Sequence, residues 1–275
     1  MERWAKYSYE VNRRRHGTVA NARHLLRSSY LSIAGVRSRI LPSPGLRCLF
    51  CHNVFDDQVG NFRTVCRNLA QTGTFIDSQT CLEMLEGKID IDGNFYHLSF
   101  DDGFRNILHN GVPVLQEFSI PAAIFVVTSL VAANYETVSR YCSTHWSVYA
   151  APIEMLTWSD LSELHRLGFT IGSHTRTHAR FSSLRSHQEL TEEISLSKEE
   201  LEQRLGSECR YISWPYGRLS DVSKESLAFV KASGYSGCFG GHRGSIKPGI
   251  TNAFSIPRHH FEPHWPMSHV RFFAS

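Results

Sequence analysis

Two adjacent carboxylates, Asp101 and Asp102, directly follow an apolar run at residues 95–100. The run has the composition of a strand, and Gly103 after the acids is typical of a turn. Two unpaired acids are costly to bury, and each raises the pKa of the other, so stability alone does not account for the pair. Such a pair at the carboxyl end of a buried strand can hold a metal ion and a general base together. A plain turn that closes the strand is the alternative.

His174 and His178 follow a short run with strand character at residues 169–173. Two imidazoles and one carboxylate of the Asp101–Asp102 pair form a ligand set for Zn²⁺ that leaves coordination positions open. Histidines at this spacing are common on protein surfaces, so the spacing gains weight only from the carboxylates in the same chain. We therefore expect a divalent metal, with Zn²⁺ as the first candidate.

The elements that must position these residues alternate between strands and helices. Runs with strand character begin near residues 46, 95, 120, 169, 211, 235 and 254. Helical patterns cover residues 62–69, 78–85, 106–118, 158–167, 188–205 and 222–232. This alternation is typical of parallel βα units. Because polar residues gather just after the strands, we expect an α/β fold of the (β/α) barrel type with about seven parallel strands.

Two other stretches are candidates for lining a site. His52 ends the first apolar run, as Asp101 and Asp102 end the second, although a single histidine is more often structural. Residues 129–152 contain several aromatic side chains and no clear periodicity. Long aromatic loops often line substrate clefts, so we expect an irregular segment there that faces the substrate.

Composition sets the limits within which this site must work. The chain has 275 residues, of which 41% are hydrophobic, enough for one substantial core. We expect no membrane span, since no apolar run approaches the ~18 residues required. Seven cysteines without a visible secretory signal suggest reduced thiols and a cytoplasmic protein.

The basic residues are concentrated before the first strand. Residues 1–47 hold ten Lys and Arg against two acids, whereas the remainder of the chain is mildly acidic. We therefore divide the chain into a basic arm at 1–45 and a catalytic domain at 46–275. The arm's basic amphipathic pattern allows peripheral contact with an anionic inner membrane face. A helix packed on the barrel, a mobile tail and a transit peptide are the alternatives, and we expect no nucleic-acid partner.

Several motifs together resemble the polysaccharide deacetylases of carbohydrate esterase family four. They are Ser-Phe-Asp-Asp-Gly at 99–103, Ser-His-Thr-Arg-Thr-His at 173–178, Ser-Trp-Pro-Tyr-Gly at 213–217, the strand at 120–126 and Cys-His-Asn-Val at 51–54. The resemblance covers about residues 46–260, in order. It implies a deformed (β/α) barrel and metal-dependent removal of acetyl groups from an N-acetylated glycan.

The resemblance also implies roles for individual residues. Asp101 would be the general base, Asp102 would bind the metal with His174 and His178, and the backbone N–H of Tyr216 would stabilise the oxyanion. For contact with the substrate we select Trp214, Pro215 and Trp158.

Two positions depart from the family pattern. Ser213 stands where the family often has an arginine that pairs with the base, and Arg258 stands where it often has a histidine that acts as the acid. An arginine cannot usefully donate a proton near neutral pH. We therefore expect Arg258 to pair with Asp101, and His52, His259 or His260 to be the acid. Two other functions remain open: a carbohydrate-binding pseudoenzyme and a non-haem iron oxygenase, which also uses two histidines and a carboxylate.

Overall fold

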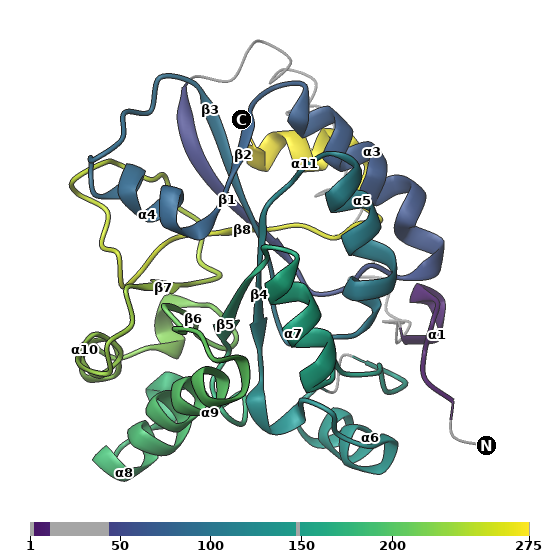
Figure 1. Cartoon of the computed structure of the whole chain (residues 1–275), viewed down its shortest axis with the longest axis vertical. Helices are drawn as coiled ribbons and strands as arrows, with labels where there is room; N and C mark the ends of the chain where they lie inside the picture. The colour runs from purple at the N-terminus through teal and green to yellow at the C-terminus, as the bar shows by residue number, and fades with distance from the viewer. Residues whose placement is uncertain (1–2, 12–43, 147–148, 275) are drawn as a thin grey trace, which may run out of the picture.

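A computed structural model describes residues 3–11, 44–146 and 149–274 of the chain. Its centre is a single parallel sheet (Figure 1). The strands are β1 (Gly45–Cys51), β2 (Thr74–Ile76), β3 (Asn94–Phe100), β4 (Ala122–Val126), β5 (Thr170–Ser173), β6 (Tyr211–Ser213), β7 (Gly237–Phe239) and β8 (His259–His260). Their order in the sheet is β7-β6-β5-β4-β3-β1-β8, and β2 pairs with β3 outside this path.

The two edges of the sheet approach one another through the segment at 256–261. Ile256 forms backbone hydrogen bonds along β7, because its N–H donates to Cys238 within the strand and its C=O accepts from Gly240 just after it. A few residues later β8 pairs with β1. The sheet therefore curls into the deformed (β/α) barrel expected from the sequence.

Helices surround this curled sheet. They are α1 (Ser8–Val11), α3 (Val59–Ala70), α4 (Ser78–Leu85), α5 (Val112–Glu117), α6 (Tyr135–Thr144), α7 (Trp158–Arg166), α8 (His187–Leu190), α9 (Leu196–Leu205), α10 (Lys224–Ala232) and α11 (Met267–Ala274). Figure 1 shows α3, α5, α7 and α9 following one another around the outside of the sheet. The sequence signals at α7 are accurate, since Thr157 caps the helix and forms a capping box with Asp160.

Alternation along the strands divides the side chains between two layers. Leu49 and Phe100 belong to the hydrophobic cluster between sheet and helices, whereas Cys48 and Phe239 belong to a second cluster inside the barrel. Because side chains alternate along a strand, Cys48, Phe50 and His52 of the β1 segment share the inner face. In the neighbouring β3, His97 lies opposite Cys48 and Ser99 opposite Phe50. The next residue on this face is Asp101, at the carboxyl end of the barrel.

Three elements differ from the sequence expectations. The aromatic segment at 129–152 contains the helix α6, begun by the Asn134 side chain that caps it. The strand β2 has only three residues, too few for a detectable period. The last strand begins at His259 instead of near Phe254, and Pro257, which has no N–H to donate, lies between the two positions.

Part of the basic arm is folded onto the barrel domain. The Ser8 hydroxyl donates to Asp57, and the backbone N–H of Ala5 donates to Pro152. The amphipathic stretch at residues 25–40, on which the membrane expectation rests, lies outside the described residues.

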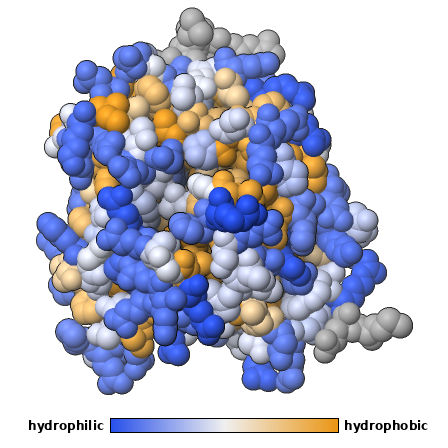
Figure 2. Space-filling view, viewed as in Figure 1, coloured by the Kyte–Doolittle hydropathy of each residue, from blue (hydrophilic) through white to orange (hydrophobic). Residues whose placement is uncertain are grey.

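Neither a membrane-spanning helix among the described residues nor one continuous apolar surface in the view of Figure 2 is seen. Over the described residues, none of the helices has both the length and the hydropathy to cross a bilayer. Hydrophobic residues reach the face in Figure 2 as separate patches among hydrophilic ones. All seven cysteines are buried, and none forms a disulfide in the structure.

Candidate active site

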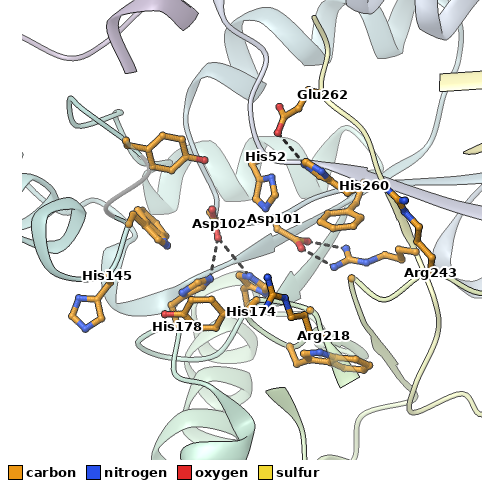
Figure 3. Close-up of a pocket in the computed structure, with 18 residues that line it drawn as sticks. His52, Asp101, Asp102, His145, His174, His178, Arg218, Arg243, His260 and Glu262 are labelled. Carbon is orange, nitrogen blue, oxygen red and sulfur yellow. Dashed lines mark hydrogen bonds and ion pairs between the residues drawn. The ribbon is translucent and has the colours of Figure 1, made fainter. Parts of the chain in front are cut away.

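A cavity of about 780 Å³ lies at the carboxyl ends of the strands. Nine residues singled out in the sequence line it: His52, Asp101, Asp102, His174, His178, Trp214, Tyr216, Arg258 and His260. Figure 3 shows the carboxylates, imidazoles and guanidinium groups facing one another across this space. The structure therefore brings together residues that are more than 200 positions apart in the chain.

Asp102, His174 and His178 form a buried cluster with ligand atoms close to one another. Asp102 Oδ1 lies 3.5 Å from His174 Nε2 and 3.4 Å from His178 Nε2. That oxygen has no hydrogen-bond partner within the described part of the chain. A buried carboxylate oxygen without a partner is costly, and a divalent cation would satisfy it. One carboxylate and two imidazoles are therefore a set that fits a divalent metal.

The hydrogen bonds and burial of His174 prepare it to be a ligand. Its Nδ1–H donates to the Ser213 carbonyl oxygen at 2.8 Å, so its Nε2 keeps a lone pair on the side of Asp102. Burial lowers the pKa of His174 to about 4, although Asp101 opposes the shift. At neutral pH the imidazole is therefore uncharged, as metal binding requires.

Backbone strain is concentrated at this site. Asp102, His178 and Tyr216 have φ angles of 74°, 60° and 65°, in the left-handed region that residues with a Cβ rarely adopt. Each costs of order 1–3 kcal/mol, and the surrounding packing must supply it. Gly103 also has a positive φ, and a Cβ there would meet Val126 Cγ1 at 2.9 Å. The left-handed conformations direct the side chains of Asp102, His178 and Tyr216 toward the cavity.

Asp101 is paired with Arg258 through both of its oxygens. Arg258 Nη1 donates to Asp101 Oδ1 at 2.8 Å and Nη2 donates to Oδ2 at 2.7 Å. The guanidinium also donates to Ser99 Oγ, Ser213 Oγ and the Gly240 carbonyl. Burial raises the pKa of Asp101, but the charges of Arg258 and His174 outweigh it and hold the pKa below its usual range. Asp101 is therefore ionised, and the expected contact with Arg258 is present.

Ser213 provides the space in which Arg258 lies. Its hydroxyl accepts a hydrogen bond of 2.6 Å from Arg258 Nη2, and it is completely buried. A longer side chain at residue 213 would occupy the position of the guanidinium. Arg258, just before β8, thus supplies the guanidinium that pairs with Asp101, and the small side chain of Ser213 leaves room for it.

The three candidate acids lie in different places. His52 lies between the Asp101–Asp102 pair and His260 (Figure 3), and the His52 and His260 ring centroids are 5.3 Å apart. His260 Nε2 in turn lies 2.9 Å from Glu262 Oε1. His259 does not line the cavity, because β-strand alternation turns it to the other side, where its ring stacks on Phe273.

Of the three residues expected to contact the substrate, one lines the cavity and two do not. Trp214 lines the cavity, whereas Pro215 is buried away from it. Trp158 is also outside the cavity: it is the first residue of α7, and its ring lies near the Arg204 guanidinium.

The cavity wall contains further residues, of which the sequence analysis identified some and missed others. Trp146 and Tyr149 come from the aromatic segment that the sequence identified. Arg218, Arg243 and Glu262 were missed. A usable signal existed for Glu262, which follows His260 by two positions and therefore lies on the same side of an extended chain.

Comparisons with known proteins agree with this geometry. A sequence model for the family described as polysaccharide deacetylase matches residues 89–236. The poly-beta-1,6-N-acetyl-D-glucosamine N-deacetylase of Staphylococcus aureus is 24% identical over 170 residues, which are 58% of this chain and 52% of that protein. The chain thus spans about half the length of the curated relatives it matches.

Solved structures resemble the fold over most of the chain. IcaB from Ammonifex degensii superposes with a TM-score of 0.70 at 23% identity, covering 84% of this chain and 97% of the other. The Streptococcus pyogenes deacetylase PplD, in complex with acetate, gives 0.66 at 19% identity, with coverages of 82% and 96%. These likenesses establish a shared fold. Because the family match extends over more than half of the sequence, the chain belongs to the polysaccharide deacetylase family.

Proposed function

We propose that the protein is a metal-dependent hydrolase that removes acetyl groups from the N-acetylated sugars of a poly- or oligosaccharide. One observation carries the proposal: an ionised carboxylate, Asp101, lies beside a ligand cluster without being part of it. Hydrolysis of an amide needs both an activating centre and a base, and this arrangement supplies one of each. Family membership and the named activity of the S. aureus relative support the same reaction.

Asp102, His174 and His178 would hold the metal, for which Zn²⁺ is our first choice given one carboxylate and two imidazoles. When bound, a divalent ion polarises the acetamide carbonyl and lowers the pKa of water toward ~7. Asp101 accepts the proton of the water that attacks the carbonyl carbon, and Arg258 keeps that carboxylate oriented and ionised.

The remaining steps need a donor for the oxyanion and an acid for the amine. The backbone N–H of Tyr216, in a left-handed turn at the cavity wall, is our candidate donor for the oxyanion. Among the three histidines we assign the acid to His52, which faces the carboxylate pair. Its proton goes to the nitrogen as the C–N bond breaks, and the products are acetate and the free amine. His260, held near Glu262, positions the His52 ring.

The walls of the cavity suit a sugar chain. Tyr149 and Tyr216 keep exposed surface at the cavity, and flat aromatic faces pack well against pyranose rings, whereas Trp146 and Trp214 are buried in its wall. PplD holds acetate, the product expected here, in a related fold. The curated relative names poly-β-1,6-linked N-acetylglucosamine, which is therefore the first substrate class to test.

Acetate release tests the proposal directly. Chelated protein should release acetate from β-1,6-linked N-acetylglucosamine oligomers only after Zn²⁺ or another divalent ion is restored. His178→Ala should remove both the metal and the activity, whereas His165→Ala, at an exposed histidine of α7, should change neither.

Two results would replace this function with one of the alternatives. Binding of the oligomers by metal-loaded protein without any acetate would indicate a carbohydrate-binding protein. Consumption of oxygen with Fe²⁺ and a 2-oxo acid, again without acetate, would indicate an oxygenase.

A further inference from the structure

The described residues form three groups of possible metal ligands, of which two line the cavity and one lies inside the barrel, apart from it. Cys48 of β1, His97 of β3 and Cys81 of α4 bring two sulfurs and one imidazole nitrogen close together. All three side chains are almost completely buried, and none lines the cavity. We propose that Cys48, Cys81 and His97 bind a thiophilic d¹⁰ ion, Zn²⁺ or Cu⁺, that has a structural role.

The pairing of β1 with β3 places two of these ligands side by side. Cys48 and His97 are partners on adjacent parallel strands, so their side chains leave the same face of the sheet together. One step further along both strands lie Phe50 and Ser99, which contact Arg258. The cluster is thus the layer beneath Arg258, and α4 closes it from the other side with Cys81.

The sulfur positions agree with a shared ion better than with a disulfide. Cys48 Sγ and Cys81 Sγ are 3.6 Å apart. Two thiolates ~2.3 Å from one zinc ion at the tetrahedral angle would stand roughly 3.8 Å apart. A disulfide needs about 2.05 Å, so its formation would require the strand and helix to move together. A separation of 3.6 Å is also an ordinary contact between two thiols, so the sulfur atoms alone do not establish a metal site. The stronger observation is the environment of His97.

His97 is arranged as metal-binding histidines usually are. Its Nε2 lies 3.0 Å from Ser78 Oγ, whereas its Nδ1 is buried without a hydrogen-bond partner among the described residues. A ligating imidazole typically donates one ring N–H to a neighbouring oxygen and offers the other nitrogen to the ion. With Ser78 as acceptor, the Nδ1 lone pair is free for this purpose. An unpaired buried nitrogen is otherwise costly, and a bound ion removes that cost.

The charges are also compatible with an ion in this position. Two thiolates would neutralise Zn²⁺, so the ion would add no net charge to an apolar layer. It would join β1, β3 and α4 directly beneath the guanidinium that holds Asp101.

Cobalt replacement tests the ligand type in the intact protein. Protein produced in cobalt-supplemented medium should show an intense thiolate-to-cobalt charge-transfer band, because the catalytic cluster contains no sulfur. The band should persist in His178→Ala. Metal analysis of protein from ordinary medium should give two ions per chain and tell zinc from copper in the second.

Matched variants locate the sulfurs. Cys48→Ser/Cys81→Ser should lose the band and one ion, whereas Cys66→Ser/Cys238→Ser, at two equally buried thiols of the outer cluster, should keep both. If the first double variant fails to fold, Cys81→Ser alone should weaken the band by about half. A wild-type protein that shows no band and holds only one ion per chain, or an undiminished band in the Cys48 and Cys81 variants, would overturn the proposal.

Discussion

The upper and lower ligand clusters of the barrel are built from different parts of the chain. The upper cluster, Asp102, His174 and His178, follows the strands, includes residues with left-handed backbone, and faces a cavity. The lower cluster, Cys48, Cys81 and His97, comes from regular strands and a helix and is sealed. The carboxylate and imidazole ligands thus face the cavity that a substrate can enter, whereas the two thiols lie in the buried interior of the barrel.

This difference separates two uses of a metal. Both clusters offer three protein ligands, but only the upper one faces a cavity from which water and substrate can complete the coordination of a metal. Backbone strain is also found only in the upper cluster, where Asp102 and His178 have left-handed φ angles. Such strained conformations tend to persist at functional sites. Arg258 lies between the two layers, and its contacts with Ser99 and Asp101 connect them.

The largest expected effects lie within the upper cluster and distinguish its two carboxylates. Asp102→Asn should weaken metal binding and thereby abolish turnover, because Asp102 Oδ1 faces both histidines. Asp101→Asn should keep the metal and lower kcat by about 10²–10⁴-fold, as expected for a missing general base. Metal content and kcat measured on the same samples provide the check. Equal loss of metal in both variants would contradict this division of roles.

A smaller effect is expected at Arg258, which touches the base and not the metal ligands. Arg258→Ala should lower kcat on the order of 10²-fold through misplacement of Asp101. The pKa of Asp101 is now held low; without the guanidinium it rises, and a carboxyl must be ionised to act as a base. The acidic limb of the rate profile should therefore move to higher pH, with metal content unchanged.

A second substitution sharpens the Arg258 experiment. Arg258→Ala/Ser213→Arg should recover part of the rate, because the new side chain can fill the space left by the guanidinium. Ser213→Arg alone should be damaging, since both groups would compete for one buried space. Wild-type turnover and an unshifted acidic limb in Arg258→Ala would limit that arginine to packing.

The sequence revealed the upper site more fully than the lower one, for a physical reason. Asp101, Asp102, His174 and His178 stand at strand ends, where polar residues interrupt apolar runs and are conspicuous. Cys48 and His97 lie within strands, and their proximity depends on a strand register that no local pattern encodes. The pairing of Arg258 with Asp101 was predicted from the absence of an arginine at residue 213, and not from a local pattern around residue 258.

The fold shows the same dependence on local signals. Long elements with a clear period, such as α3 and β3, were placed well, whereas the three-residue strand β2 was missed. The helix α6 was overlooked because aromatic residues dominate its segment and conceal a short amphipathic period. Trp158 lies outside the cavity wall, which its position at the start of a helix did not reveal.

The smallest predicted effect would confirm that the two clusters work independently. Ser78→Ala removes the oxygen that accepts from His97 but leaves the helix start intact, because Asp77 is the residue that caps α4. Loss of such a supporting hydrogen bond typically costs about 10–100-fold in metal affinity. The lower ion should therefore dissociate more readily against a thiophilic chelator, while kcat for acetate release and the upper ion stay unchanged. Gln79→Ala, one residue further along the exposed side of the same helix, is the matched control and should retain both ions. If Ser78→Ala reduced turnover with the lower ion still bound, the lower layer would act on catalysis through packing instead of through a metal.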